Sequence, residues 1–173
     1  HSMSMEFFTE PWMNLFFGDR TEDYIKMHLM SAITFIPYGC MVDEFQHKVY
    51  GNPDMTPEER HNVWKRLEKE YMPHLNIKGS CFYEKGGFWQ QQLHIFGSPF
   101  YYIDYCNAQI CALQYKIMMD EDREKAWESY LSFSKISAKE FFTDSVLKVG
   151  VSNPFNEQCI SEIVDKLDKN FIN

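Results

Sequence analysis

Glycine and proline divide this chain into segments that have the length and the hydrophobic spacing of α-helices. Residues 100–119 form a long, mostly apolar stretch without either residue, which predicts a largely buried helix. Residues 156–171 place apolar side chains at helical spacing between charged ones. The run Thr-Pro-Glu-Glu at residues 56–59 combines an N-cap, a proline at the first helical position and acids in the first turn. The sequence therefore predicts an all-α fold in which the helices pack as a bundle.

Proline and glycine also mark where these helices should end. Pro37 and Gly39 are expected to separate a helix over residues 21–36 from another over residues 40–50. Residues 74–87 contain three glycines and leave room for one short extended segment. The other helices are expected over residues 57–71, 88–95, 121–133 and 137–146, the last of them capped by Ser137.

Charge and cysteine content exclude several classes of protein. The net charge is −8 and no basic run occurs, which argues against a nucleic-acid partner. Neither an apolar run of transmembrane length nor a signal peptide is visible, so no membrane partner is expected. The five cysteines are odd in number and none has CxxC spacing, which is typical of free thiols in a reducing compartment.

Asp43 and His47 delimit the run DEFQH, which has the form of the zinc-binding motif HExxH with Asp in the first place. On a helix the two side chains would share a face, as two metal ligands do. No third ligand follows at a useful distance, and motifs this short often match by chance. The alternative, a polar pair on a helix face, is favoured.

A run rich in tyrosine, FGSPFYYIDY, occupies residues 96–105 and follows His94. Its Gly-Ser-Pro break leads directly into the start of a helix. Phenol hydroxyls at such a junction can donate hydrogen bonds to a carbonyl or an oxyanion, and the His94 imidazole can donate to the same ligand. The alternative is a packed aromatic corner with one satisfied histidine, and spacing alone favours it.

Glu6 lies in the otherwise apolar segment HSMSMEF. A carboxylate on an apolar face is costly unless it is paired or hydrogen-bonded. It could orient a histidine that binds a metal. The alternative is a partly exposed glutamate at the edge of a helix.

Four motifs occur together and in order along nearly the whole chain. They are HSMSMEF followed by PWM, then GCMVDEFQH, then NPDMTPEERHNVWKRLEKEYMPH, and then GGFWQQQLHIFGSPFYYIDYCNAQICALQ. In these motifs the chain resembles oligoendopeptidase F, of the thimet oligopeptidase family of zinc metallopeptidases. The resemblance implies that residues 1–173 are the C-terminal part of the catalytic domain, a helical bundle that forms one side of a peptidase channel.

The resemblance also implies where the zinc lies. In the family, two histidines of HExxH and a glutamate on a following helix hold the ion, and this chain contains none of the three. The ligand glutamate is expected two residues before His1, which would place Glu6 seven residues past it on the same helix face. Zinc is therefore expected in the full-length enzyme and not in this chain alone, with Glu6 supporting a ligand.

The family's substrate-binding residues match several positions here. His94, Tyr102 and Tyr105 correspond to the histidine and the tyrosines that face the zinc, and a tyrosine of this set stabilises the oxyanion. Gly97 is the only glycine left in the loop that moves on substrate binding, between His94 and Phe100. The resemblance leaves open whether Tyr101 or Tyr102 takes the first tyrosine role.

The resulting expectation is a bacterial, cytoplasmic zinc endopeptidase that hydrolyses short peptides, of which this chain is an inactive part. Its partners would be short peptides and the N-terminal remainder of the same protein. Two alternatives stay open: a non-catalytic helical peptide-binding or adaptor module, and a metal protein that uses Asp43 and His47.

Overall fold

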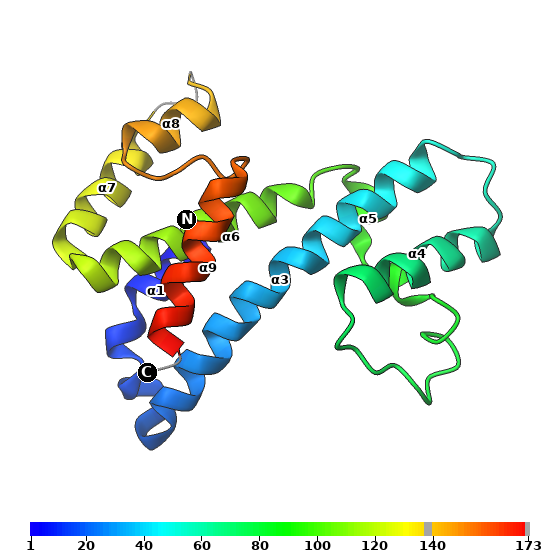
Figure 1. The fold of residues 1–173 in the computed structure, drawn as a ribbon, viewed down its shortest axis with the longest axis horizontal. Coiled ribbons are helices and arrows are strands. Elements are labelled where there is room, and N and C mark those ends of the chain that lie inside the picture. Colours follow the sequence, from blue (N-terminus) through cyan, green and yellow to red (C-terminus); the bar gives the residue numbers. More distant parts are fainter. Residues whose placement is uncertain (137–139, 172–173) are drawn as a thin grey trace. The chain divides into compact units, whose positions relative to one another are not determined.

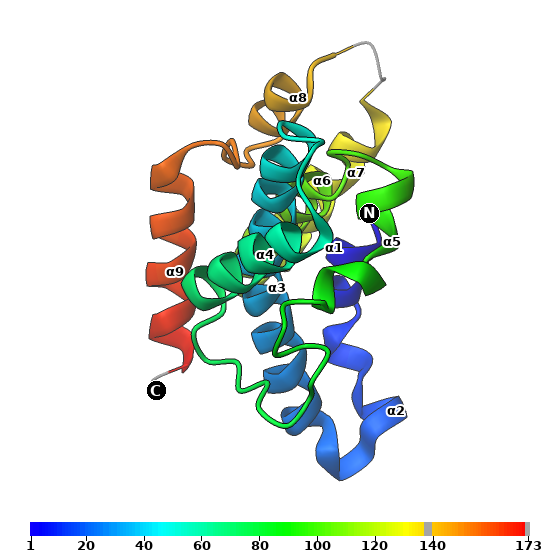
Figure 2. The same cartoon turned by 90° about the vertical axis from the view of Figure 1, so that its right-hand side faces the viewer.

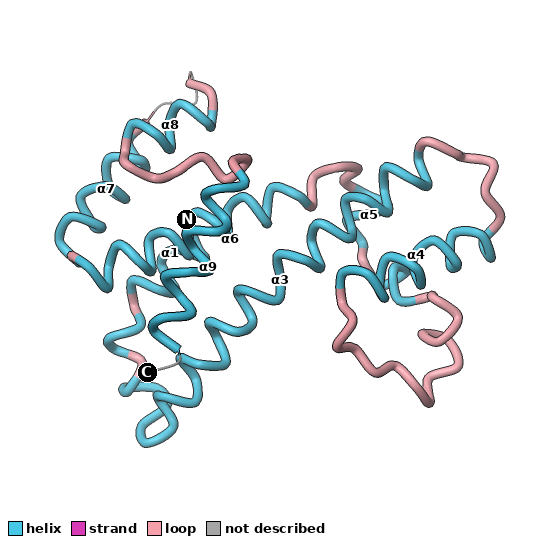
Figure 3. Tube along the Cα trace, in the orientation of Figure 1, coloured by secondary structure: helices cyan, strands magenta, loops and turns pink. Residues whose placement is uncertain are grey.

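The computed structural model describes residues 1–136 and 140–171, and these residues form helices and loops with no strand (Figure 1, Figure 3). The prediction of an all-α fold is therefore confirmed. In chain order the elements are α1 (Ser2–Phe8), η1 (Glu10–Trp12), α2 (Asn14–Phe17), η2 (Gly18–Arg20), α3 (Thr21–Tyr50), α4 (Pro57–Tyr71), η3 (Phe88–Gln91), α5 (Leu93–Gly97), α6 (Ile103–Glu121), α7 (Arg123–Lys135), α8 (Phe142–Lys148) and α9 (Glu157–Phe171).

The predicted start of α4 is confirmed in detail. The Thr56 hydroxyl accepts a hydrogen bond from the Glu59 backbone N–H at 3.2 Å, and the Glu59 carboxylate accepts one from the Thr56 N–H at 2.7 Å. This reciprocal capping box satisfies two backbone donors that an uncapped helix would leave unpaired.

The prediction of a helix break at Pro37 and Gly39 is wrong, because α3 runs through both residues (Figure 1). Pro37 lacks the N–H that would bond the preceding turn, which weakens the helix at this point. Close packing accompanies the continuity: a β-carbon on Gly39 would lie 2.1 Å from Cys106 Sγ. Gly39 thus allows the start of α6 to approach the backbone of α3. The glycine serves this packing, and it does not end the helix as predicted.

Other predicted boundaries also differ from the structure. Residues 74–87 contain turns and no extended segment. The helix predicted over residues 88–95 is a 3-10 turn, η3, followed by the short α5. The long helix predicted from residue 100 starts at Ile103 as α6, and the predicted cap Ser137 lies outside the described residues.

The chain divides into two compact units, and the division falls within α3 and α6. Unit 1 comprises His1–Ala32 and Asn107–Asn173, and unit 2 comprises Ile33–Cys106. The core of unit 1 joins α1, α6, α7 and α8 through the buried side chains of Phe8, Cys111, Tyr115, Ala126, Tyr130, Val146 and Val151. In α9, the apolar positions Cys159, Ile163 and Leu167 are buried at helical spacing.

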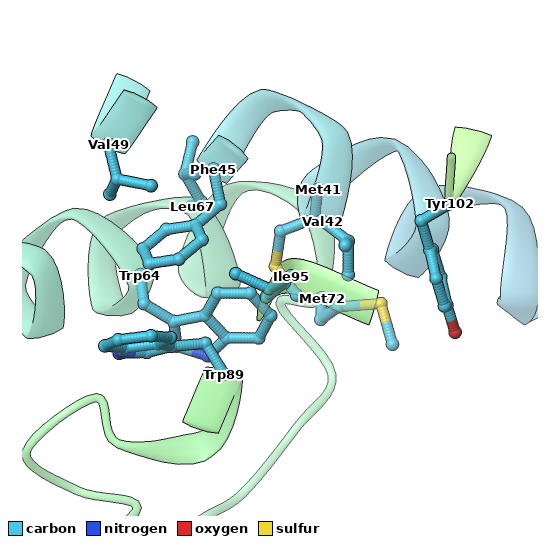
Figure 4. Close-up of a cluster of buried hydrophobic side chains, with 10 residues drawn as sticks. All are labelled: Met41, Val42, Phe45, Val49, Trp64, Leu67, Met72, Trp89, Ile95 and Tyr102. Carbon is cyan, nitrogen blue, oxygen red and sulfur yellow. The ribbon is translucent and has the colours of Figure 1, made fainter. Parts of the chain in front are cut away.

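The core of unit 2 forms where the C-terminal half of α3 packs on α4, which the two views of the ribbon show side by side (Figure 2). Phe45 of α3 and Trp64 of α4 are fully buried, with ring centroids 5.2 Å apart. The loop after α4 returns Trp89, Ile95 and Tyr102 to this core (Figure 4). This core therefore fixes the segment that carries the predicted donors.

One helical stretch, Glu10–Tyr50, meets a length and hydropathy test for a membrane span, with a mean hydropathy of 1.2 in its best window. The prediction was that no apolar run reaches transmembrane length. The helical stretch is long enough because α3 continues through Pro37 and Gly39, where a break was expected. A core helix passes the same test, and α3 supplies Met41, Val42 and Phe45 to the buried core of unit 2. A single such helix is weak evidence for a membrane span.

Candidate functional site

Unit 2 brings the predicted donors into contact, and we call His94, Tyr101, Tyr102 and Tyr105 the donor cluster. The ring centroid of His94 lies 5.2 Å from that of Tyr102 and 5.5 Å from that of Tyr105. Tyr105 in turn lies 5.4 Å from both Tyr101 and Tyr102. All these pairs meet edge to face, which is a favourable geometry for aromatic rings.

A chain of hydrogen bonds runs through this cluster from the interior of unit 2. The Tyr38 hydroxyl donates to Gln92 Oε1 at 3.0 Å. Gln92 Nε2 lies 2.8 Å from His94 Nδ1, and His94 Nε2 lies 3.3 Å from the Tyr105 hydroxyl. The position and the hydrogen bonding of His94 are thus set from both sides of its ring.

The three tyrosines differ in exposure. Tyr101 is 48% exposed, whereas Tyr102 is 8% exposed and lies at the edge of the core of unit 2 (Figure 4). Burial raises the pKa of Tyr102, and the neighbouring Cys106 and Tyr105 add to this effect. The buried Tyr102 therefore remains a protonated donor at neutral pH, whereas Tyr101 is the more accessible of the two to a ligand.

The end of α3 holds the loop that precedes these tyrosines. The fully buried Gln46 accepts a hydrogen bond from the Phe100 N–H through Oε1 at 2.9 Å. Phe100 has a φ of 59°, a left-handed conformation that is strained for a residue with a β-carbon. The Tyr50 hydroxyl also donates to the Ile95 carbonyl, and the ring of His47 packs on Phe100. The segment from Ile95 to Phe100 is therefore held at both ends by side chains of α3.

Gly97 and Glu6 lie in different surroundings. Gly97 ends α5 at the surface, and a β-carbon there would meet nothing within 4 Å, so the structure gives no steric reason for a glycine. Glu6 belongs to unit 1, where its carboxylate lies 2.9 Å from His28 Nε2 and its side chain is 54% exposed. The supporting role predicted for Glu6 toward a zinc ligand stays a prediction.

The DEFQH run forms a polar pair. His47 Nε2 lies 3.4 Å from the Asp43 carboxylate, one helical turn away. Burial raises the pKa of Asp43, and His47 partly offsets that effect. In residues 1–136 and 140–171, no group of three or more His, Cys, Asp or Glu side chains is placed to hold a metal ion. The residues present therefore do not fit the zinc site that the resemblance implies for the whole enzyme.

Sequence reasoning missed Gln92, Tyr38 and Gln46. Gln92 is the last of three consecutive glutamines, and nothing in that run distinguishes this half-buried amide from its exposed neighbours. Gln46 lies inside the DEFQH run, and its role depends on a loop 54 residues further along the chain. Only the tertiary contacts identify these three side chains.

Comparisons with known proteins find that the chain is similar to solved structures of peptidases. No protein-family model and no curated protein matches the chain. Three solved structures match 98% of it: one named as an oligoendopeptidase F, at 47% identity and a TM-score of 0.94; PZ peptidase A with an inhibitor, at 46% and 0.93; and one named as an oligoendopeptidase F from Bacillus anthracis, at 41% and 0.80. The chain spans 27–30% of the length of these proteins.

Proposed function

The chain belongs to the oligoendopeptidase F family as a segment of about 30% of its relatives' length, and we propose that it is the substrate-binding, C-terminal part of a zinc endopeptidase that hydrolyses short peptides. The observation that carries this proposal is the donor cluster. It gathers three phenol hydroxyls and one imidazole on a short segment that is anchored in the core of unit 2.

Peptide hydrolysis converts a carbonyl oxygen into an oxyanion, and donors that are already in place stabilise that charge more in the transition state than in the substrate. Of these donors, Tyr105 is the one that we assign to the oxyanion, because its hydroxyl oxygen is already positioned by the imidazole of His94. The exposed Tyr101 and the neighbouring Tyr102 would bind the peptide backbone beside it.

The zinc of the complete enzyme would be held by the remainder of the protein, since the described residues of this chain offer no group that fits it. When bound there, the ion would supply the activated water that attacks the peptide carbonyl. The residues of this chain would bind and orient the substrate and donate hydrogen bonds to its oxygen. We extend the proposal to a cytoplasmic, bacterial enzyme whose partners are short peptides.

The proposal is tested by Tyr105→Phe in the full-length enzyme. Loss of a donor to the oxyanion should lower kcat by about 10²–10³, roughly 2.7–4 kcal/mol, and change KM little. Steady-state kinetics on a quenched fluorescent peptide would measure both constants. Tyr101→Phe and Tyr102→Phe are the matched variants, because each removes one hydroxyl from the same cluster and reports whether that hydroxyl acts on kcat or on KM.

A packed aromatic corner predicts a different result. In that case each Tyr→Phe change would alter thermal stability and leave both kinetic constants near the wild-type values. If neither Tyr102→Phe nor Tyr105→Phe lowers kcat by more than about threefold, the transition-state role is excluded. A threefold change corresponds to less than the 1.36 kcal/mol of activation free energy that a tenfold change represents. A non-catalytic peptide-binding module would then be the better description of these residues.

A further inference from the structure

We propose that Gln92, oriented by Tyr38, holds His94 in the tautomer that carries its proton on Nε2, and that this leaves the Tyr105 hydroxyl proton free for the substrate. The inference rests on the proposed function of Tyr105 as a donor. It assigns positioning roles to Gln92 and Tyr38, which the resemblance does not involve.

The direction of the first hydrogen bonds fixes the tautomer. A glutamine amide has an acceptor oxygen on one side and a donor NH₂ on the other. Because the Tyr38 hydroxyl donates to Oε1, the NH₂ of Gln92 faces His94 Nδ1 at 2.8 Å. Nδ1 must then accept, so it carries no proton. A neutral imidazole holds one proton, which therefore lies on Nε2.

The tautomer decides what Tyr105 can do. With the proton on Nε2, His94 donates to the Tyr105 oxygen across 3.3 Å, and the hydroxyl proton of Tyr105 remains available. With the proton on Nδ1, Nε2 would instead accept, and the Tyr105 hydroxyl would use its proton on His94. A hydroxyl that accepts one hydrogen bond also becomes a stronger donor of the next. Only the first arrangement is compatible with a Tyr105 that stabilises an oxyanion.

Tyr38 is suited to orient the amide. Its ring packs edge to face on Trp64, Phe88 and Tyr102, with centroids 6.0–6.5 Å away. Burial raises the pKa of its hydroxyl, with smaller effects from Tyr102 and Glu68, so the group keeps its proton. The hydroxyl is thus a fixed donor at the inner end of the chain of hydrogen bonds, and Gln92 turns its acceptor oxygen toward it.

The decisive change is Gln92→Glu in the full-length enzyme. A carboxylate presents only acceptors, so the single proton of the neutral His94 imidazole moves from Nε2 to Nδ1, which donates it to the carboxylate. We expect kcat to fall about 10–100-fold, as when other partners that orient a histidine are removed, with KM changed less than threefold. Gln91→Glu is the matched control, because it makes the same chemical change on an exposed glutamine next in the chain and should leave kcat unchanged.

The tautomer is read directly by ¹⁵N NMR of histidine-labelled full-length protein, with His94 assigned from the signals lost in His94→Ala. We expect an unprotonated Nδ1 and a protonated Nε2 in the wild type, and a protonated Nδ1 in Gln92→Glu. Tyr38→Phe keeps the ring and removes only the orienting hydroxyl, so it should give a mixture of the two tautomers. Circular dichroism would establish that each variant is folded.

Two results would overturn the inference. One is a wild-type spectrum with the proton on Nδ1, whatever the kinetics show. The other is a Gln92→Glu variant with the predicted change of tautomer and an unchanged kcat. The NMR result does not depend on catalysis: if Tyr105→Phe leaves kcat unchanged while Nε2 carries the proton, the proposed function fails and the assignment of the tautomer stands.

Discussion

At the scale of the single residue, Gln46 shows how a buried side chain supports a strained loop. The left-handed backbone of Phe100 costs about 1–3 kcal/mol, as for other residues held in sparsely populated conformations. The hydrogen bond from the Phe100 N–H to Gln46 Oε1 offsets part of that cost and gives a buried amide a partner. Gln46 Nε2 has no partner among the protein atoms that the structure describes, so Oε1 is the atom on which its role depends.

Gln46→Leu should destabilise the chain by about 1–3 kcal/mol, because it leaves the Phe100 N–H without its acceptor while changing side-chain volume little. Chemical denaturation would measure the free energy of unfolding. Gln90→Leu is the control, since it makes the same substitution at an exposed position and should have a much smaller effect. Equal stability of the two variants would contradict the role given to Gln46.

At the scale of the element, close packing at Cys106 joins α3 and α6. A β-carbon on Gly39 would overlap Cys106 Sγ at 2.1 Å. The Cys106 thiol also lies 3.6 Å from the Ile36 carbonyl, on the same side of α3. The glycine at position 39 is therefore explained by the close contact with Cys106, and not by a bend in α3.

Gly39→Ala should destabilise the chain by about 1–3 kcal/mol, since overpacking outweighs the gain of roughly 1 kcal/mol that alanine brings to a helix interior. The same change in a Cys106→Ala background should be neutral or stabilising, because the sulfur is gone. A double-mutant cycle by thermal denaturation would measure this coupling. If Gly39→Ala is equally harmful in both backgrounds, the contact with Cys106 is not the cause.

The start of α4 offers a second prediction at this scale. Thr56→Ala removes the side-chain acceptor of the capping box and should cost about 0.5–2 kcal/mol. Thr56→Ser keeps the hydroxyl and should lie close to the wild type in the same unfolding experiment. A serine variant as unstable as the alanine variant would show that the methyl group matters more than the cap.

At the scale of the whole molecule, the two units present many apolar side chains to solvent. In the segment between α1 and α3, Trp12, Leu15 and Phe16 are 52–75% exposed. Large exposed apolar groups of this kind often mark surfaces that another part of a protein covers. The chain also spans about 30% of the length of its relatives, which is consistent with the proposal that a larger protein surrounds it.

The purified chain should contain no stoichiometric zinc and should not cleave peptides, because donors without an activated water have no reaction to stabilise. Metal analysis and a fluorescent peptide assay would test the two statements. One tightly bound zinc per chain that is lost in Asp43→Ala or His47→Ala would contradict the first. Turnover that a chelator inhibits would contradict the second.

The sequence by itself determined the helical class and the cap of α4, which depend on local rules, namely helical periodicity and N-cap chemistry. Spacing alone favoured a packed aromatic corner for the run of tyrosines, and the resemblance to oligoendopeptidase F singled out the residues of the donor cluster. Even there, whether Tyr101 or Tyr102 faces the substrate was left open, since two adjacent tyrosines have the same local signal.

Only the tertiary structure decided the continuity of α3 and the arrangement around His94. A proline and a glycine inside a helix are tolerated when packing requires them, and the sulfur of Cys106, which lies beyond any local window, occupies the space beside Gly39. In the same way, Gln92 differs from Gln90 and Gln91 only because folding brings it to Tyr38, 54 residues earlier in the chain. Hydrogen bonds between distant residues depend on the packed core that aligns them, and no spacing in the sequence encodes that alignment.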